Sequence, residues 1–198
     1  MHEHAESRRS AQPTLPAYEL QRRPLTRVEA ELVVAQIRRS PKITGYSLAE
    51  WTGDRDTFVL VRPESGELLG ALLVHHLLQG WSEIAVVFVL EQYRGQGYGR
   101  AMLRGALRTL EHSGRRQLLF FSDDLMERMA QEAGFEVHTD VDALVSRRPG
   151  YRGFLKLVYP VQWMANAYRI RELRRKRREL ACSFEFKIAL KESEGTSA

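Results

Sequence analysis

Cysteine is almost absent from this 198-residue chain, and so are long apolar runs. The single cysteine, Cys182, excludes an internal disulfide framework and a zinc site built from several cysteines. No apolar stretch approaches the roughly 18–20 residues that a membrane-spanning helix needs. The first 16 residues lack the apolar centre that a secretory signal peptide carries. We therefore expect a cytoplasmic protein without a membrane span.

The net charge of +5 is concentrated in one segment, residues 162–180. This segment has seven basic and two acidic residues, so it accounts for the whole excess and leaves the rest of the chain neutral. Its apolar residues recur at helical spacing, which predicts a basic amphipathic helix that docks by its apolar face. The outward face is then either a solvated surface or a contact for nucleic-acid phosphates. The basic residues are Arg169, Arg171, Arg174, Arg175, Lys176, Arg177 and Arg178.

Hydrophobic residues make up 43% of the chain, which is enough for one domain with a core. We expect a disordered tail over residues 1–16, a domain over 17–160, and an extension over 161–198 that holds the basic helix and a terminal strand. Strand and helix patterns mix along the domain, which predicts an α/β (α+β) fold with a central mixed β-sheet flanked by helices. Strands are expected over 18–22, 57–62, 68–77, 81–90, 117–121, 135–139 and 153–159, with an edge strand over 184–190. Helices are expected over 26–40, within 94–113 and over 124–133.

A glycine-rich loop, Arg94-Gly95-Gln96-Gly97-Tyr98-Gly99, joins a central apolar strand to an amphipathic helix. Glycines allow a backbone to approach a ligand closely. The helix that follows directs its first free N–H groups and the positive end of its dipole at the same place. Such a loop predicts a binding site for a pyrophosphate.

Three kinds of phosphate-binding loop compete for this sequence. A P-loop is excluded, because no lysine followed by a hydroxyl residue occurs here. A dinucleotide-binding loop would need a third glycine where Arg100 stands and a first glycine closer to the strand, although Asp123 or Asp124 could imitate its ribose-binding acid. The third pattern, Arg/Gln-x-x-Gly-x-Gly/Ala, fits without adjustment.

This third pattern resembles the acyl-CoA-binding motif of the GNAT superfamily of N-acetyltransferases. The stretch Val89–Gly97 is similar to the signature Val-x-Pro-Glu-x-Arg-Gly-x-Gly, with Glu91 and Gln92 in place of Pro-Glu. The resemblance covers roughly residues 17–160, and it implies an enzyme that uses acetyl-CoA as cosubstrate. The cofactor-binding residues that it implies are Val87, Phe88, Val89, Arg94, Gly95, Gln96, Gly97, Tyr98, Gly99, Arg100 and Ser122.

The resemblance also implies two catalytic groups on the same strand. The stretch Glu83–Val89 is similar to the catalytic strand of a histone acetyltransferase, in which the matching glutamate is the general base. In the family, the N–H at the position of Val89 is free and bonds the thioester carbonyl. Because Glu83 and Val89 are six residues apart, we expect their side chains on the same face. Burial of Glu83 against Trp81 would raise its pKa.

The general acid departs from the family pattern. Ala130 stands where many members have a tyrosine, so water, Ser122 or a tyrosine such as Tyr159 would have to reprotonate the thiolate. This departure keeps a competing hypothesis open, a catalytically weak acyl-CoA-binding module that acts through the basic helix.

The acceptor is expected to be a primary amine on a small molecule, a protein or an aminoacyl-RNA. His75 and His76 point to opposite faces of their strand, so one of them is a candidate for the acceptor cleft. Tyr46 and Trp51 would form an aromatic wall of that cleft or pack a helix on the sheet. The sequence leaves oligomerisation open.

Overall fold

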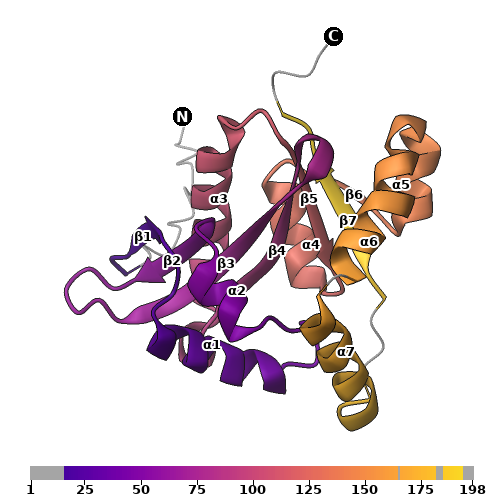
Figure 1. Ribbon diagram of the computed structural model, residues 1–198. Helices are drawn as coiled ribbons and strands as arrows, with labels where there is room; N and C mark the ends of the chain where they lie inside the picture. Colours follow the sequence, from indigo (N-terminus) through magenta and orange to yellow (C-terminus); the bar gives the residue numbers. More distant parts are fainter. Residues whose placement is uncertain (1–15, 165, 182–184, 194–198) are drawn as a thin grey trace, which may run out of the picture.

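The computed structural model describes residues 16–164, 166–181 and 185–193, so Cys182 and nearly all of the expected tail lie outside the described residues (Figure 1). Its centre is one twisted sheet in the order β1-β2-β3-β4-β5-β7-β6. All neighbouring strands are antiparallel except β4 and β5, which are parallel. The strands are β1 (Glu19–Arg22), β2 (Thr57–Val61), β3 (Leu68–Leu77), β4 (Trp81–Val89), β5 (Arg116–Phe121), β6 (Glu136–His138) and β7 (Lys187–Lys191). The prediction of a mixed sheet flanked by helices is confirmed.

Helices cover both faces of the sheet (Figure 1). On one face, α1 (Arg27–Arg39) and α2 (Leu48–Gly53) pack over β2 to β4. On the other face, α3 (Tyr98–Glu111) and α4 (Asp124–Glu132) enclose a second apolar cluster. Thr26 and Ser47 begin α1 and α2 with complete capping boxes, in which the hydroxyl and the glutamate three residues later each bond the other's backbone N–H.

The segment after β6 is helical where a strand was expected. It forms α5 (Val141–Arg147), a π-helical turn (Phe154–Val158) and α6 (Tyr159–Met164), so the predicted strand over 153–159 is wrong. The sequence did carry the helical signal, because its larger apolar residues recur at intervals of three and four. This stripe packs on Trp81, whose ring stacks on that of Phe154 with centroids 4.6 Å apart. The residues of the stripe are Tyr151, Phe154, Leu155, Val158 and Tyr159.

The last strand was expected at an edge of the sheet, and this prediction is also wrong. β7 pairs with β5 on one side and with β6 on the other. Both of its faces are buried, since Ile188 and Leu190 join one apolar cluster and Ala189 joins another. Residues 187–191 therefore complete the sheet from within.

β4 contains one residue more than its partner requires. Leu73 pairs with Val86 and Val74 pairs with Ile84, so Ala85 is a β-bulge. A one-residue insertion reverses the faces of a strand. Ile84, on the N-terminal side of the bulge, shares the α3 face with Val87 and Val89, and Glu83 therefore lies on the opposite face. The expectation that Glu83 and Val89 share a face is wrong for this reason.

The basic segment includes α7 (Ala167–Glu179), which docks by charged side chains and not by its apolar stripe. Arg169, Glu172 and Lys176 are the buried residues of α7, whereas Ile170 and Leu173 are only half-buried. The ammonium group of Lys176 donates to three backbone carbonyls at the C-terminal end of α1 and in the loop after it, those of Ile37, Ser40 and Ile43, at 2.5–2.7 Å. Since the last carbonyls of a helix lack partners within the helix, Lys176 serves as a cap for α1.

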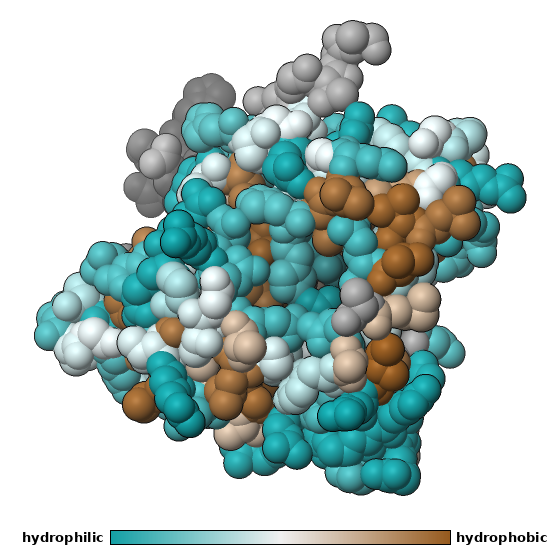
Figure 2. All heavy atoms as spheres, viewed as in Figure 1, coloured by the Kyte–Doolittle hydropathy of each residue, from teal (hydrophilic) through white to brown (hydrophobic). Residues whose placement is uncertain are grey.

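The outer surface of α7 is mostly hydrophilic, whereas the surface over α6 carries a hydrophobic group of residues (Figure 2). Leu157, Val161 and Met164 are the exposed apolar residues there. Among the helices of the described residues, none combines the length and the apolar character that crossing a membrane requires.

We predict that Lys176→Met destabilises the protein by about 2 kcal/mol or more, because each buried carbonyl that loses its donor costs about 1–3 kcal/mol. Urea denaturation measures this change. Arg177→Met, at the next and exposed position of α7, is the matched control and should stay within about 0.5 kcal/mol of the unaltered protein. Equal stability of the two variants would show that the Lys176 contacts do not hold α7 in place.

Candidate active site

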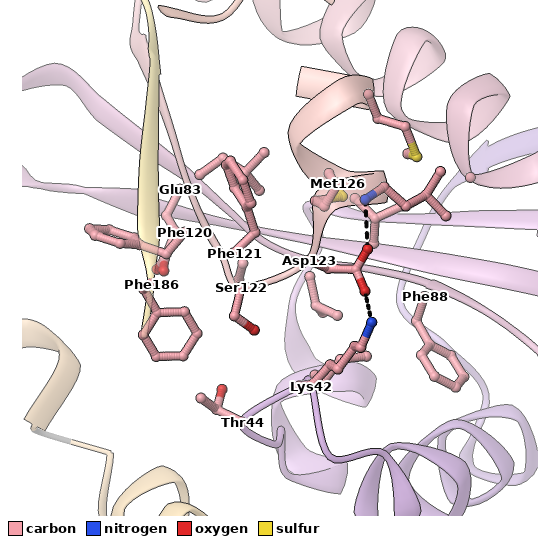
Figure 3. Close-up of a pocket in the computed structure, with 18 of the residues that line it drawn as sticks. Lys42, Thr44, Glu83, Phe88, Phe120, Phe121, Ser122, Asp123, Met126 and Phe186 are labelled. Carbon is pink, nitrogen blue, oxygen red and sulfur yellow. Dashed lines mark hydrogen bonds and ion pairs between the residues drawn. The ribbon is translucent and has the colours of Figure 1, made fainter. Parts of the chain in front are cut away.

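A cavity of about 1260 Å³ opens where β4 and β5 separate. The two strands pair only from Trp81–Arg116 to Ile84–Leu119, although β4 continues to Val89 and β5 to Phe121. Figure 3 shows Glu83, Phe88, Phe121 and Ser122 around this space, with Phe186 beside them. Every cofactor-binding residue predicted from the sequence lines the cavity except Gln96, and Glu83 lines it as well.

The backbone of β4 presents polar groups to this gap. Pairs in an antiparallel ladder alternate between hydrogen-bonded and non-hydrogen-bonded ones. The Leu90 N–H donates to the Leu69 carbonyl at 3.0 Å, so the pair of Gly70 and Val89 is non-hydrogen-bonded. The N–H of Val89 therefore points away from β3 and toward the gap that β5 leaves, and the same alternation applies to Val87. An extended ligand could pair with these groups as an additional strand.

The glycine loop closes one end of the cavity. Gly97 is the N-cap of α3 with φ +89°, a left-handed conformation that glycine adopts without steric cost. The first N–H groups of α3, from Tyr98 onward, begin at this point of the cavity wall. Arg94 folds back, and its Nε donates to the Val89 carbonyl at 3.1 Å. This arrangement fits a pyrophosphate at the helix N-terminus.

A salt bridge crosses the cavity beside Ser122. Lys42, in the loop between α1 and α2, donates to the carboxylate of Asp123, as Figure 3 shows. Asp123 is also the N-cap of α4 and accepts from the Leu125 N–H at 2.8 Å. The ion pair therefore links the two faces of the sheet across the opening between β4 and β5.

Glu83 is buried at the inner end of the cavity, and each of its oxygens has a neighbour. The Tyr159 hydroxyl donates to Oε1 at 2.7 Å, and Nδ1 of His75 lies 3.5 Å from Oε2. Burial raises the pKa of the Glu83 carboxyl, but the hydrogen bond and charge of His75, the charge of Arg169 and the Tyr159 hydroxyl together outweigh burial. The pKa therefore lies below its usual value, and the expectation of a raised pKa is wrong.

Comparisons with known proteins agree with this geometry. The model of the GNAT acetyltransferase family matches residues 17–135, which is more than half of the chain. The chain belongs to the GNAT acetyltransferase family. Residues 17–135 therefore form an acetyltransferase domain of this family. No curated protein sequence matches the chain significantly.

Solved structures of GNAT proteins share the fold at low sequence identity. N-acetylglutamate synthase from Neisseria gonorrhoeae, complexed with coenzyme A and N-acetyl-glutamate, has a TM-score of 0.58 and 13% identity over 91% of this chain. This chain spans only 36% of that enzyme. A Mycobacterium tuberculosis protein in complex with coenzyme A has a TM-score of 0.57 and 14% identity, covering 88% of this chain and 98% of its own. Diaminobutyrate acetyltransferase from Paenibacillus lautus, in complex with L-2,4-diaminobutyric acid and coenzyme A, has a TM-score of 0.51 and 17% identity, covering 62% of this chain and 80% of its own.

A second, more polar cavity of about 290 Å³ lies next to Glu83. Glu83, Tyr159 and Trp163 line both cavities, so they lie between the larger cavity and this smaller one. Its other polar walls come from α2 and its C-cap, β3, α6 and the start of α7. They include Glu50, Asp54, His75, Gln162, Asn166 and Arg169.

The candidates for the acceptor cleft divide between the site and the core. His75 lines the smaller cavity, whereas His76 faces away from it and lies 2.8 Å from the Ser82 hydroxyl. Tyr46 lines the larger cavity, and its hydroxyl donates to the carbonyl of the bulge residue Ala85. Trp51 is fully buried in the core between α2 and the sheet.

Part of the predicted nucleic-acid surface is committed inside the protein. Arg169 and Lys176 are buried, and Arg175 donates to Glu172, to Glu179 and to the Arg38 carbonyl. Glu50 and Arg169 both line the smaller cavity, but nothing in the sequence beyond their charge indicated a place at the site. The basic residues that stay exposed are Arg171, Arg174, Arg177 and Arg178.

We predict that Gly97→Val weakens acetyl-CoA binding by at least about tenfold, because a β-branched residue disfavours a positive φ and adds bulk where the pyrophosphate would lie. Isothermal titration calorimetry measures the affinity. Gly66→Val is the matched control, since Gly66 also has a positive φ (+67°) but lies in the turn between β2 and β3 with open space around it. If both variants bind acetyl-CoA as tightly as the unaltered protein, the loop does not hold the pyrophosphate.

Proposed function

We propose that the protein transfers the acetyl group of acetyl-CoA to a primary amine by direct attack of the amine on the thioester. The observation that carries the proposal is the position of Glu83, a buried carboxylate that borders both the larger cavity and the smaller polar one. An amine that enters from the smaller cavity would meet the thioester beside this carboxylate. The acceptor is then a small molecule, a protein or an aminoacyl-RNA that presents an amino group there.

Bound acetyl-CoA supplies the acetyl group as an activated thioester. We assign the N–H of Val89 to the carbonyl oxygen of that thioester, because it points into the gap between β4 and β5. A fixed donor at this position stabilises the negative charge that develops on the oxygen, without reorganisation of water. Residues Val87 to Val89 and the loop Arg94–Arg100 hold the remainder of the cosubstrate.

Glu83 accepts the proton that the amine must lose. An alkylammonium group has a pKa near 10.4, so it is protonated at neutral pH. The lowered pKa keeps Glu83 ionised at that pH and able to receive the proton. Since a carboxylate of low proton affinity holds a proton weakly, the proton must move on, and the smaller polar cavity that Glu83 lines gives it a path to solvent.

Ala130, at the position where many family members have a tyrosine, cannot donate a proton. Tyr159 is our candidate for the general acid in its place. Its hydroxyl donates to Glu83, and its ring stacks on that of Phe120 with centroids 4.8 Å apart. Burial and the charge of Glu83 raise the pKa of Tyr159 well above its usual value, so the hydroxyl is protonated before the reaction. Once Glu83 has taken the proton of the amine, its charge no longer opposes ionisation of Tyr159, and the hydroxyl can give its proton to the thiolate. Ser122 also lines the larger cavity and is the competing donor.

The alternative of a catalytically weak binding module is not favoured, because a buried carboxylate, an oriented backbone N–H and a tyrosine hydroxyl all belong to residues that line one cavity. Nucleic-acid contact through the four exposed arginines of α7 stays a prediction, as do the cytoplasmic location and any oligomer.

Replacing Glu83 by glutamine keeps the shape of the side chain but removes its basicity. We expect turnover to fall by roughly 10²–10⁴-fold while the affinity for acetyl-CoA changes little. A thiol-release assay with a panel of primary amines measures turnover. Glu64→Gln, in the exposed turn after β2, is the control and should retain full activity. Unchanged turnover of Glu83→Gln at every pH would remove Glu83 from the mechanism.

Tyr159→Phe separates the two candidates for the general acid. The variant keeps the ring that stacks on Phe120 but loses the hydroxyl, so kcat should fall by about 10-fold or more with little change in the affinity for acetyl-CoA. Ser122→Ala, measured in the same assay, should have close to normal kcat. The reverse pattern would assign reprotonation of the thiolate to Ser122.

A further inference from the structure

Arg169 lies buried beside the site, although it belongs to the most basic helix of the chain. Its Nη2 is 2.8 Å from Oε1 of Glu50 and 2.9 Å from Nδ1 of His75. Its Nε makes a second hydrogen bond to Glu50 at 3.2 Å, and its guanidinium lies 5.1 Å from the centroid of the Tyr46 ring. A buried arginine that is fixed on three sides cannot serve as a surface contact.

His75 connects this guanidinium to Glu83. The titratable and charged groups around Glu83 come from five elements, and Asp54 lines the same smaller cavity. Among those described groups, Arg169 is the one that is positive at every working pH. The five are His75 on β3, Glu50 on α2, Tyr46 in the loop before α2, Tyr159 on α6 and Arg169 on α7.

We propose that Arg169 is a positioning residue of the acetyl-transfer site, which fixes His75 and keeps the Glu83 carboxylate ionised within its buried surroundings. The catalytic meaning of this role rests on the function proposed above. The arginine acts through His75 and through its charge and touches neither the cosubstrate nor the reacting atoms.

The contacts that hold α7 against the rest of the protein also fix the position of Arg169. The Asn166 side chain caps the helix by accepting from the N–H of Tyr168 at 3.1 Å and from that of Arg169 at 3.3 Å, which fixes the backbone of Arg169. One turn further, Glu172 packs against Gly45, where a Cβ would lie 2.4 Å from the Glu172 Cγ and where φ is +133°. Lys176 then holds the helix to the end of α1. Three buried charged residues on one face therefore set the position of the guanidinium.

Two variants test the proposal because they remove charges of opposite sign beside Glu83. Arg169→Met removes a positive charge from a buried carboxylate, so the Glu83 pKa should rise by about one unit or more. Glu50→Gln removes a negative charge and leaves Arg169 uncompensated, so the Glu83 pKa should stay or fall. The measurement is ¹³C NMR titration of the side-chain carboxyl in protein labelled at glutamate, with Glu83→Gln to assign the signal. If Arg169 had a merely structural role, the Glu83 pKa would shift in the same direction in both variants.

The pH profile of kcat/KM should follow the titration. Because Glu83 must be ionised to accept a proton, the acid limb of Arg169→Met should move to higher pH, and activity should recover as the pH rises. Arg169→Lys keeps the charge, so its acid limb should stay close to that of the unaltered protein. Arg171→Met, at an exposed position of α7, is the matched control and should change neither measurement.

The proposal about Arg169 and the proposed function can fail independently of each other. Equal Glu83 titration in Arg169→Met, Glu50→Gln and the unaltered protein overturns the proposal, and so does a shift of the same sign in both variants. If Arg169→Met does not fold, Arg169→Lys and Glu50→Gln still decide it, since a raised Glu83 pKa in either of them contradicts it. The titration requires no turnover, so a shift as expected together with full activity of Glu83→Gln would remove Glu83 from the mechanism and leave the electrostatic role of Arg169 standing. Absence of acetyl transfer to every amine tested by the unaltered protein would reject the proposed function alone.

Discussion

The bulge at Ala85 allows one strand to serve both faces of the sheet at the site. On its N-terminal side, Glu83 faces the helices α2 and α6; on its C-terminal side, Val87 and Val89 belong to the α3 face. The bulge carbonyl would otherwise be a buried polar group, and Tyr46 supplies its donor. Without the extra residue, Glu83 would turn toward the apolar cluster under α3 and away from the smaller polar cavity.

The separation of β4 from β5 leaves backbone groups without ladder partners and opens a place for a ligand. Backbone N–H and C=O groups on the β5 side of Val87 and Val89 have no ladder partner from β5, because the pairing ends at Ile84 and Leu119. Buried backbone groups are almost always paired in folded proteins. The opening between the two parallel strands β4 and β5 is therefore best understood as a place for an extended ligand, with the N-terminus of α3 at one end for its phosphates.

Local signals in the sequence predicted most of the framework. The capping box at Thr26, the glycine at position 97 and the apolar run of β4 each depend on residues close together in the chain, so their geometry could be inferred directly. The bulge at Ala85 could not be inferred from the sequence, because a strand with one extra residue has the same composition as one without it. The missed helix before α6 had a readable helical spacing, but Phe154–Val158 also contains the apolar residues of a short strand, and only its packing on Trp81 selects between them.

The surroundings of Glu83 show most clearly what sequence reasoning could not reach. Tyr159 is 76 residues from Glu83 in the chain and Arg169 is 94 residues from His75, so no motif links them. Burial alone predicts a raised pKa, and the sign is reversed by His75 on the neighbouring strand together with the distant Arg169 and Tyr159. The part of the chain that matches the family, residues 17–135, supplies the carboxylate and the loop, whereas Tyr159 and Arg169 lie beyond it. A GNAT protein with alanine at the usual tyrosine position can therefore retain a hydroxyl and a fixed cation beside its proposed general base, Glu83. This requires that a later segment of the chain folds back over β4 and brings these groups there.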